Sequence, residues 1–268
     1  IAIRAGLDGN TLASGGDTVI LDAQPRDAQE QTVLVKANGP DVTASVNGAD
    51  AVKLAPKNAL GHICIQYQRY DKARRWPKIR IAEFKLRPLG MTALFNGQNL
   101  DGWNVIPDHK SVFSVVDGAL NIKNGNGQIE TAGTYKDFVL QLDVFSNGDH
   151  LNSGVFFRTP PGVFWKGYES QVRNEWANDD RNKPVDYGTG GMYALQPARR
   201  VVSTDREWFT KTIVVDGNHF AVWVNGFQVS DYYDTRPAVT NADGKNGFVN
   251  DAGTINLQGH DPTTDLSF

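Results

Sequence analysis

The side chains that could do chemistry lie on three segments in which polar and apolar residues alternate. Alternate side chains of a β-strand point to opposite faces, so each segment would present its polar groups on one side of a sheet. These groups are Glu169, Gln171 and Arg173; Arg158, on the face of Phe156; and Asn256, Gln258 and His260. Carboxylate, imidazole, guanidinium and amide groups on one face could bind a polar ligand and move a proton. The alternative is that they are ordinary solvent-facing positions.

Aromatic residues gather in the segment between residues 159 and 193. They are Trp165, Tyr168, Trp176, Tyr187 and Tyr193. Flat rings stack on the apolar faces of sugar rings while amides and charged groups bind hydroxyls, so this mixture predicts a glycan ligand. For Trp165 and Trp176, packing in a core is an equally good interpretation.

An ordinary glycosidase needs two carboxylates that flank the scissile bond. Only Glu169 lies on the predicted polar face, because the other acidic residues of this region fall in flanking loops. Those residues are Asp149, Glu175, Asp179 and Asp180. The sequence therefore establishes no such pair.

A divalent metal ion could be bound by Asp149 and His150 together with Glu169 and His260, which offer oxygen and imidazole ligands. No dense spacing such as His-x-x-x-His supports this site, and an Asp-His pair in a loop is more typical of a turn. We therefore expect no cofactor, with a divalent ion as the alternative.

Short strands must position these groups, because alternation with period two dominates the chain. One predicted strand face carries Phe138, Leu140, Leu142 and Val144. Asn-Gly and Asp-Gly turn signals recur between such runs and agree with the 27 glycines. No run approaches the roughly 18 apolar residues that span a bilayer, and one cysteine excludes a disulfide framework. The pattern predicts an all-β sandwich or jelly roll with no membrane span.

Charge divides the 268 residues near residue 90. Residues 1–90 carry 13 Lys and Arg against 9 Asp and Glu, whereas residues 91–268 carry 14 against 21. The basic run 69–80 could bind phosphate, but the net charge of -3 gives no general attraction to nucleic acid. We interpret this run as a solvated hairpin loop and expect no nucleic-acid partner.

The two parts echo each other. Residues 32–70 and 212–260 each contain a strand, a tight glycine turn, a strand ending in Val-Asn-Gly, a loop and a strand that opens with glycine. We expect residues 1–90 to form a smaller β unit that is a partial copy of the sandwich formed by residues 91–268.

Six motifs stand in the order found in a known family. They are LFNGQNLDGWNV (94–105), NSGVFFR (152–158), YESQV (168–172), TGGMY (189–193), VWVNG (222–226) and INLQGH (255–260). Through them, residues 91–268 resemble the 3-keto-disaccharide hydrolase domain, itself similar to concanavalin A-like and laminarinase-like jelly rolls. Residues 8–89 resemble only the C-terminal half of that domain, through SVNG (45–48), GHICIQYQ (61–68) and KIRIAEFKLRPL (78–89).

The resemblance implies a hydrolase or lyase of the periplasm or extracellular space that cleaves a glycoside already oxidised to a ketone at C3. Such a reaction needs a base for the C2 hydrogen and an electrophile for the enolate. We expect Glu169 or His260 as the base, Arg158 as the enolate stabiliser, and Gln171 and Tyr193 as positioning residues. The remaining expected contacts to an oligosaccharide or glycoside come from Arg173, Gln258, Trp165, Tyr168 and Trp176. The alternative is a non-catalytic carbohydrate-binding or structural module of a larger extracellular assembly.

The end of the chain departs from the family pattern. Members usually finish with a strand of the form FRN-I-x-I, whereas this sequence ends in DLSF and begins with IAIRA. We therefore expect residues 1–5 to fill the last strand position of the 91–268 sandwich. They could do so within the chain or by self-association, through strand exchange with a neighbouring copy.

Overall fold

The chain divides into two compact units, Ile1–Ile81 and Ala82–Phe268. The structure, a computed structural model, describes residues 2–8, 11–14, 17–18, 32–38, 40–54, 62–64 and 88–268. For residues 2–8, 11–14, 17–18 and 62–64 it describes the backbone alone. The basic run 69–80 lies outside the described residues. Within the described residues there is no helix, and so none that could cross a membrane.

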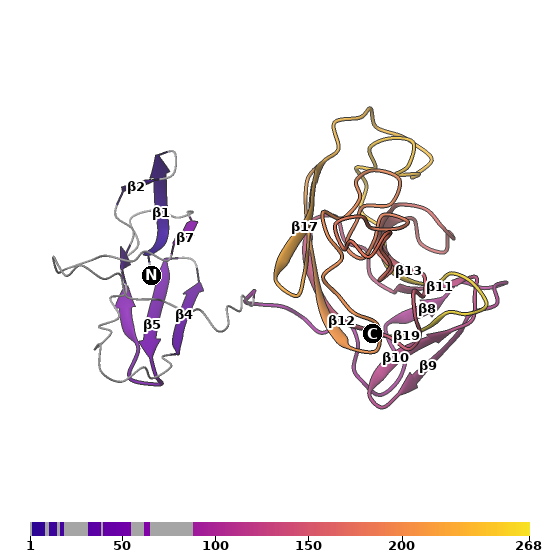
Figure 1. Ribbon diagram of the computed structural model, residues 1–268, viewed down its shortest axis with the longest axis horizontal. Helices are drawn as coiled ribbons and strands as arrows, with labels where there is room; N and C mark the ends of the chain where they lie inside the picture. Colours follow the sequence, from indigo (N-terminus) through magenta and orange to yellow (C-terminus); the bar gives the residue numbers. More distant parts are fainter. Residues whose placement is uncertain are drawn as a thin grey trace. The chain divides into compact units, whose positions relative to one another are not determined.

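The first unit contains two small antiparallel sheets (Figure 1). One joins β1 (Ala2–Asp8) to β2 (Thr11–Ser14), β3 (Asp17–Thr18) and β7 (His62–Cys64). The other has the order β4 (Val33–Asn38), β5 (Asp41–Val46), β6 (Val52–Leu54). β4 and β5 are the two strands expected in residues 32–48, whereas β6 lies in the segment expected as a loop. That this unit is a partial copy of the second stays a prediction.

The first strand, β1, pairs with other strands of its own unit on both of its edges. Ala2 pairs with Thr18 on one edge and with Cys64 on the other, so both ladder edges of the strand are used there. The prediction that residues 1–5 fill the last strand of the 91–268 sandwich from within the chain is therefore wrong. Exchange between copies stays a prediction.

The second unit is a sandwich of two antiparallel sheets. The five-stranded sheet has the order β14-β13-β18-β11-β8, and the seven-stranded sheet has the order β17-β16-β15-β12-β19-β10-β9. Figure 1 shows β17 and β9, the two ends of the larger sheet, on opposite sides of the unit. The first set of strands is β14 (Tyr168–Val172), β13 (Ser153–Thr159), β18 (Thr254–Gly259), β11 (Gly127–Thr131) and β8 (Trp103–Val105). The second set is β17 (Phe227–Tyr233), β16 (His219–Val224), β15 (Trp208–Asp216), β12 (Phe138–Ser146), β19 (Asp265–Ser267), β10 (Ala119–Lys123) and β9 (Val112–Val116). The prediction of an all-β jelly roll is confirmed.

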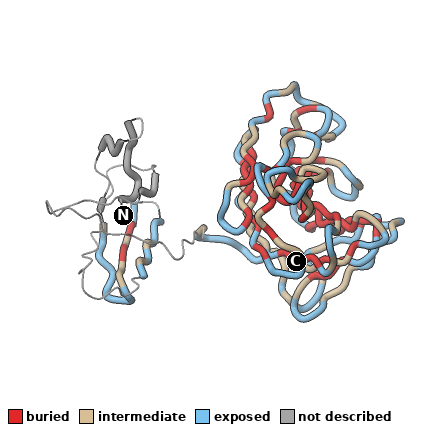
Figure 2. Tube along the Cα trace, viewed as in Figure 1, coloured by how far each residue is buried: buried red, intermediate tan, exposed pale blue. Residues whose placement is uncertain are grey.

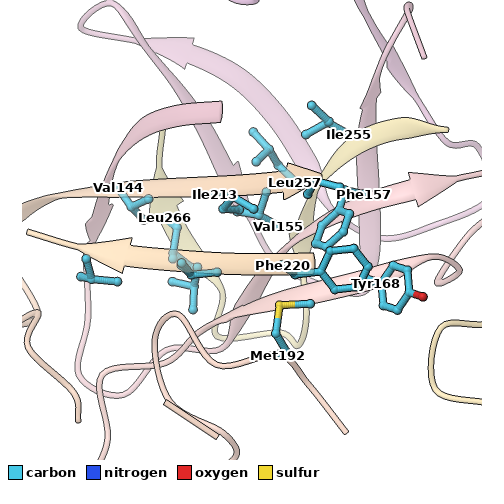
Figure 3. Packing of buried hydrophobic residues seen from close by; sticks show 14 of the residues in the cluster. Val144, Val155, Phe157, Tyr168, Met192, Ile213, Phe220, Ile255, Leu257 and Leu266 are labelled. Carbon is cyan, nitrogen blue, oxygen red and sulfur yellow. The ribbon is translucent and has the colours of Figure 1, made fainter. Parts of the chain in front are cut away.

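The core fills the space between the two sheets. Val144 and Ile213 of the larger sheet and Val155 of the smaller one are fully buried and belong to one apolar cluster (Figure 3). Phe157 and Phe220 meet edge to face with ring centroids 5.4 Å apart. Figure 2 shows the buried positions gathered in the middle of the unit.

The five-stranded sheet is covered on both faces. Every residue of β11, β13, β14 and β18 is buried, although only alternate side chains can point into the core. The other alternate positions form the outer face of this sheet, and loops cover them. Buried polar groups can therefore be expected on that face.

Candidate functional site

Six polar side chains share the outer face of the five-stranded sheet. Phe156 pairs with Glu169 on one side and with Asn256 on the other, and Asn256 pairs in turn with Glu130. One row of side chains thus crosses β14, β13, β18 and β11. We call this set the polar face; it comprises Glu169, Gln171, Asn256, Gln258, Gln128 and Glu130. The sequence analysis predicted the first four of these residues and missed the two from β11.

Three amides of the polar face are buried without all of their hydrogen bonds. Gln128 and Asn256 are 0% exposed and Gln258 is 1% exposed. Gln128 Nε2, Asn256 Nδ2 and Gln258 Oε1 have no hydrogen-bond partner in the structure. Buried polar atoms are normally paired, so three unpaired amide atoms on one face indicate a place where water or a ligand hydroxyl binds.

Glu169 is the one carboxylate of the polar face that has no donor among the described residues. A Cβ at Gly154 would overlap its Oε1 atom, so a glycine at this position leaves room for the carboxylate. Glu169 is 6% exposed. Burial raises its pKa to about 8, against the lowering effect of Lys245; nearby Asp186 raises it further and Lys211 lowers it. A carboxyl group with this pKa can hold or accept a proton near neutral pH.

A second carboxylate, Asp186, lies close to Glu169 and escaped the sequence analysis. Its Oδ2 accepts hydrogen bonds from Gln171 Nε2 at 3.1 Å, Asn152 Nδ2 at 3.2 Å and Arg173 Nη1 at 3.3 Å. Asp186 has φ 48°, in an irregular loop where strand alternation gives no signal. Asp186 Oδ2 is thus shared among three donors, one of them the Arg173 guanidinium.

Loops are anchored on the polar face by its own side chains. The Gly162 amide donates to both carboxylate oxygens of Glu130, at 3.0 and 3.1 Å. The Trp165 amide donates to Gln128 Oε1 at 2.8 Å. Gln128, Glu130 and Gln171 thus hold loops, which leaves Glu169, Asn256 and Gln258 for a ligand.

Aromatic and basic side chains surround the polar face. Lys245 Nζ lies 5.5 Å from the ring centre of Trp165 and 4.6 Å from that of Tyr193. Tyr187 packs on Tyr193 at 5.1 Å, and the Trp165 ring meets His260 edge to face at 6.2 Å. Burial, followed by the charges of Asp186 and Glu169, raises the pKa of Tyr193. The predicted Trp165 and Tyr193 thus lie beneath Lys245, which alternation in the sequence did not single out, and the predicted His260 adjoins Trp165.

Arg158 does not lie on the polar face, and its predicted role as enolate stabiliser is wrong. The register of β13 shifts between Phe156 and Thr159, and Arg158 has φ 54°, so alternation fails there. Its guanidinium is buried and donates to Val249 O at 2.7 Å, Gly217 O at 2.6 Å and Lys136 O at 3.2 Å.

Tyr168 was also wrongly predicted as a ligand contact. It packs in the core on Phe220, with ring centroids 4.6 Å apart, and its hydroxyl points away from the cluster (Figure 3). That hydroxyl donates to Asp234 Oδ2 at 2.7 Å, and burial raises its pKa. Alternation along β14 places Tyr168 on the side opposite Glu169.

The predicted sugar contact Trp176 and the weak metal-ligand candidates Asp149 and His150 lie in loops, where each contacts other side chains or main-chain groups. Trp176 is half-buried beneath the Arg181 guanidinium, 4.1 Å from the ring centre. Asp149 forms an ion pair with Arg206, and His150 Nδ1 lies 2.8 Å from Asn174 O. Among the described residues, no group of three or more His, Cys, Asp and Glu side chains has the arrangement of a metal site.

The fold and the polar face define a jelly-roll domain that carries a cluster of buried polar side chains on its smaller sheet. Residues 90–268 match the 3-keto-alpha-glucoside-1,2-lyase-like domain, and the chain belongs to this family. The resemblance found in the sequence is therefore confirmed, and a glycan-active role follows at this coarse level.

Several solved structures are similar to this chain. Two proposed glycosyl hydrolases of Parabacteroides distasonis are 20% and 23% identical, with TM-scores of 0.50 and 0.51. The alignments cover 66% and 63% of this chain and 89% and 91% of those chains. The carbohydrate-binding module CBM66 of Bacillus subtilis is 13% identical with a TM-score of 0.45, over 64% of this chain and 94% of that one. No curated protein matches the sequence.

Proposed function

We propose that the second unit cleaves 3-keto-glycosides by elimination followed by hydration. The observation that carries this proposal is Glu169, a buried carboxyl group without a hydrogen-bond donor among the described residues, with its pKa raised to about 8. Hydrogens next to a ketone are weak acids, and their removal is most efficient when the pKa of the base lies near the working pH. The family supplies the substrate class, a glycoside with a ketone at C3.

In the proposed first step, Glu169 takes the proton from C2 and the electron pair of that C–H bond forms the enolate. The negative charge then lies on the C3 oxygen, where Lys245 is our candidate to stabilise it, since its charge acts on Glu169 and it sits over Tyr193. The enolate collapses, a C1–C2 double bond forms and the C1–O bond breaks. The leaving oxygen takes a proton, for which His260 is the candidate donor, and water later adds to the double bond.

The amides of the polar face would hold the sugar. Asn256 Nδ2 and Gln258 Oε1 are a free donor and a free acceptor, matched to sugar hydroxyl groups. Trp165 is 42% exposed and can stack on a sugar ring. An oligosaccharide or glycoside in the periplasm or outside the cell is therefore the expected partner.

The experiment is to incubate the protein with a 3-keto-glucoside and with its parent glucoside, with and without a divalent metal ion, and to measure release of the aglycone. We expect turnover of the keto substrate alone, rising with pH up to about 8 as Glu169 loses its proton. Glu169→Gln should remove turnover, whereas the matched control Glu207→Gln, at an exposed position, should retain it. Turnover that survives Glu169→Gln would show that Glu169 is not the base.

A non-catalytic glycan-binding role is the second candidate, and the unpaired amides favour it. Amides bind hydroxyl groups but move no proton, and Asp186 is already paired with Arg173. Binding of the keto substrate without turnover at any pH would support the non-catalytic glycan-binding role.

A further inference from the structure

Lys211 is a buried lysine that the proposed reaction does not use. It lies on the inward side of β15, between Phe209 and Ile213, and is 0% exposed. Among the described residues it forms no ion pair within 4.0 Å. Burying an ammonium group without a paired carboxylate costs several kcal/mol, so a compensating interaction is needed.

The Lys211 ammonium group crosses the core and binds the strand that carries Glu169. Its Nζ donates to Ser170 O at 2.7 Å and to Gln171 O at 2.9 Å. Ser170 and Gln171 directly follow Glu169 in β14. Lys211 thus approaches this strand from the core side, while Glu169 lies on the outer side.

We propose that Lys211 is a positioning residue that holds β14 from the core side and places a titratable ammonium group behind the strand that carries Glu169. This inference rests on the proposed role of Glu169 as a base. Three charged groups act on Glu169: Lys245 and Asp186, which lie among the loops on the outer face, and Lys211 behind the sheet. Glu169 is in turn the charged side chain that acts on Lys211, whose pKa burial lowers to about 7.

Linkage between the two groups gives a test that needs no change at Lys211. If Glu169 and Lys211 stabilise each other's charged forms, removing either charge must shift the titration of the other in a defined direction. In Glu169→Gln, the lysine resonance that titrates near pH 7 should titrate at a lower pH. Nitrogen-15 NMR of lysine Nζ groups in the full chain measures this shift, and an unchanged midpoint would overturn the proposal.

Variants of Lys211 test the same linkage from the other side. Lys211→Gln removes the charge and keeps a donor for the β14 carbonyl groups, whereas Lys211→Met removes both. In whichever variant folds, the Glu169 carboxyl should titrate at a higher pH, and the acid limb of turnover should move with it. The control Lys123→Met, at a surface lysine paired with Asp265, should move neither.

The carboxyl titration, followed by carbon-13 NMR, reports on Lys211 whether or not the protein turns over a keto substrate. An absence of turnover with a shifted Glu169 titration would reject the proposed function and keep the linkage. Turnover with an unshifted titration and an unshifted pH profile in a folded Lys211 variant would reject the linkage and keep the function. A Lys211→Met variant that is only less stable, with the same pH profile, would assign Lys211 a purely structural role.

Discussion

Two groups of buried polar side chains in the second unit differ in how completely they are hydrogen-bonded. Around Arg158 all three guanidinium nitrogens donate, and three of their acceptors are main-chain carbonyl groups. On the polar face, Gln128, Asn256 and Gln258 are equally buried, yet each keeps one side-chain atom unpaired. Burial alone therefore does not distinguish a binding site from the scaffold.

This difference in hydrogen bonding distinguishes side chains that stabilise the fold from side chains that are available to a ligand. Leaving a buried polar atom unpaired costs roughly 1–3 kcal/mol, so a fold that serves only stability pairs such atoms or replaces them with apolar groups. Arg158 meets this condition and ties β13 to the loops at Lys136, Gly217 and Val249. Three of the six unpaired buried side-chain atoms among the described residues lie together on the polar face, which is the pattern of groups kept for a ligand.

The largest expected loss of stability comes from replacing Arg158. Arg158→Met should lower the free energy of unfolding by about 3–5 kcal/mol, because it removes the hydrogen bonds to three main-chain carbonyl groups, that of buried Val249 among them, and the ion pair with Asp137. Urea denaturation of the full chain measures this, and Arg200→Met, at an exposed arginine, should change it by less than about 0.5 kcal/mol. Turnover per folded molecule should stay the same. A large loss of turnover without loss of stability would show that Arg158 has a role in catalysis after all.

These two groups also show how far the sequence could predict the site. Alternation placed Glu169, Gln171, Asn256 and Gln258 correctly on one face, because β14 and β18 are regular at these positions. The same rule failed for Arg158, since one irregular step in β13 turns the side chain to the other side. No sequence pattern marks such a step.

Loop residues were beyond prediction for a different reason. Asp186 and Lys245 act on Glu169 from segments without regular alternation, so their positions depend on tertiary packing alone. The fold followed from many agreeing signals, because turns and strand periods along residues 91–268 all predicted a jelly roll. The pairing of β1 depended on which strand edges were available, which local sequence does not encode.

Glu169 should have an intermediate effect on the free energy of unfolding, and this effect should depend on pH. Its pKa is raised from 4.5 to about 8 in the folded protein, so between these values the folded state holds a proton that the unfolded state has lost. The free energy of unfolding should therefore fall as pH rises from 5 to 7, by at most about 1.4 kcal/mol per pH unit from this group.

Glu169→Gln should remove this part of the slope, so the variant should match the wild type near pH 5 and be more stable near pH 7. Urea denaturation at several pH values compares the two, with Glu207→Gln as the control that keeps the wild-type slope. The window stops at pH 7 because Lys211, with its lowered pKa, begins to contribute with the opposite sign above it. Identical slopes in wild type and Glu169→Gln would mean that the carboxyl group is not buried as described.

The smallest change in stability should come from the polar face itself. Gln258→Met keeps the length of the side chain and removes a buried oxygen that has no partner, so the free energy of unfolding should change by less than about 1 kcal/mol. Sugar binding should weaken all the same, because the lost acceptor is one the ligand would use. Calorimetric titration with a 3-keto-glucoside, alongside urea denaturation, measures both quantities on one sample. A loss of stability as large as that expected for Arg158→Met would place Gln258 in the scaffold and remove the distinction between the two groups.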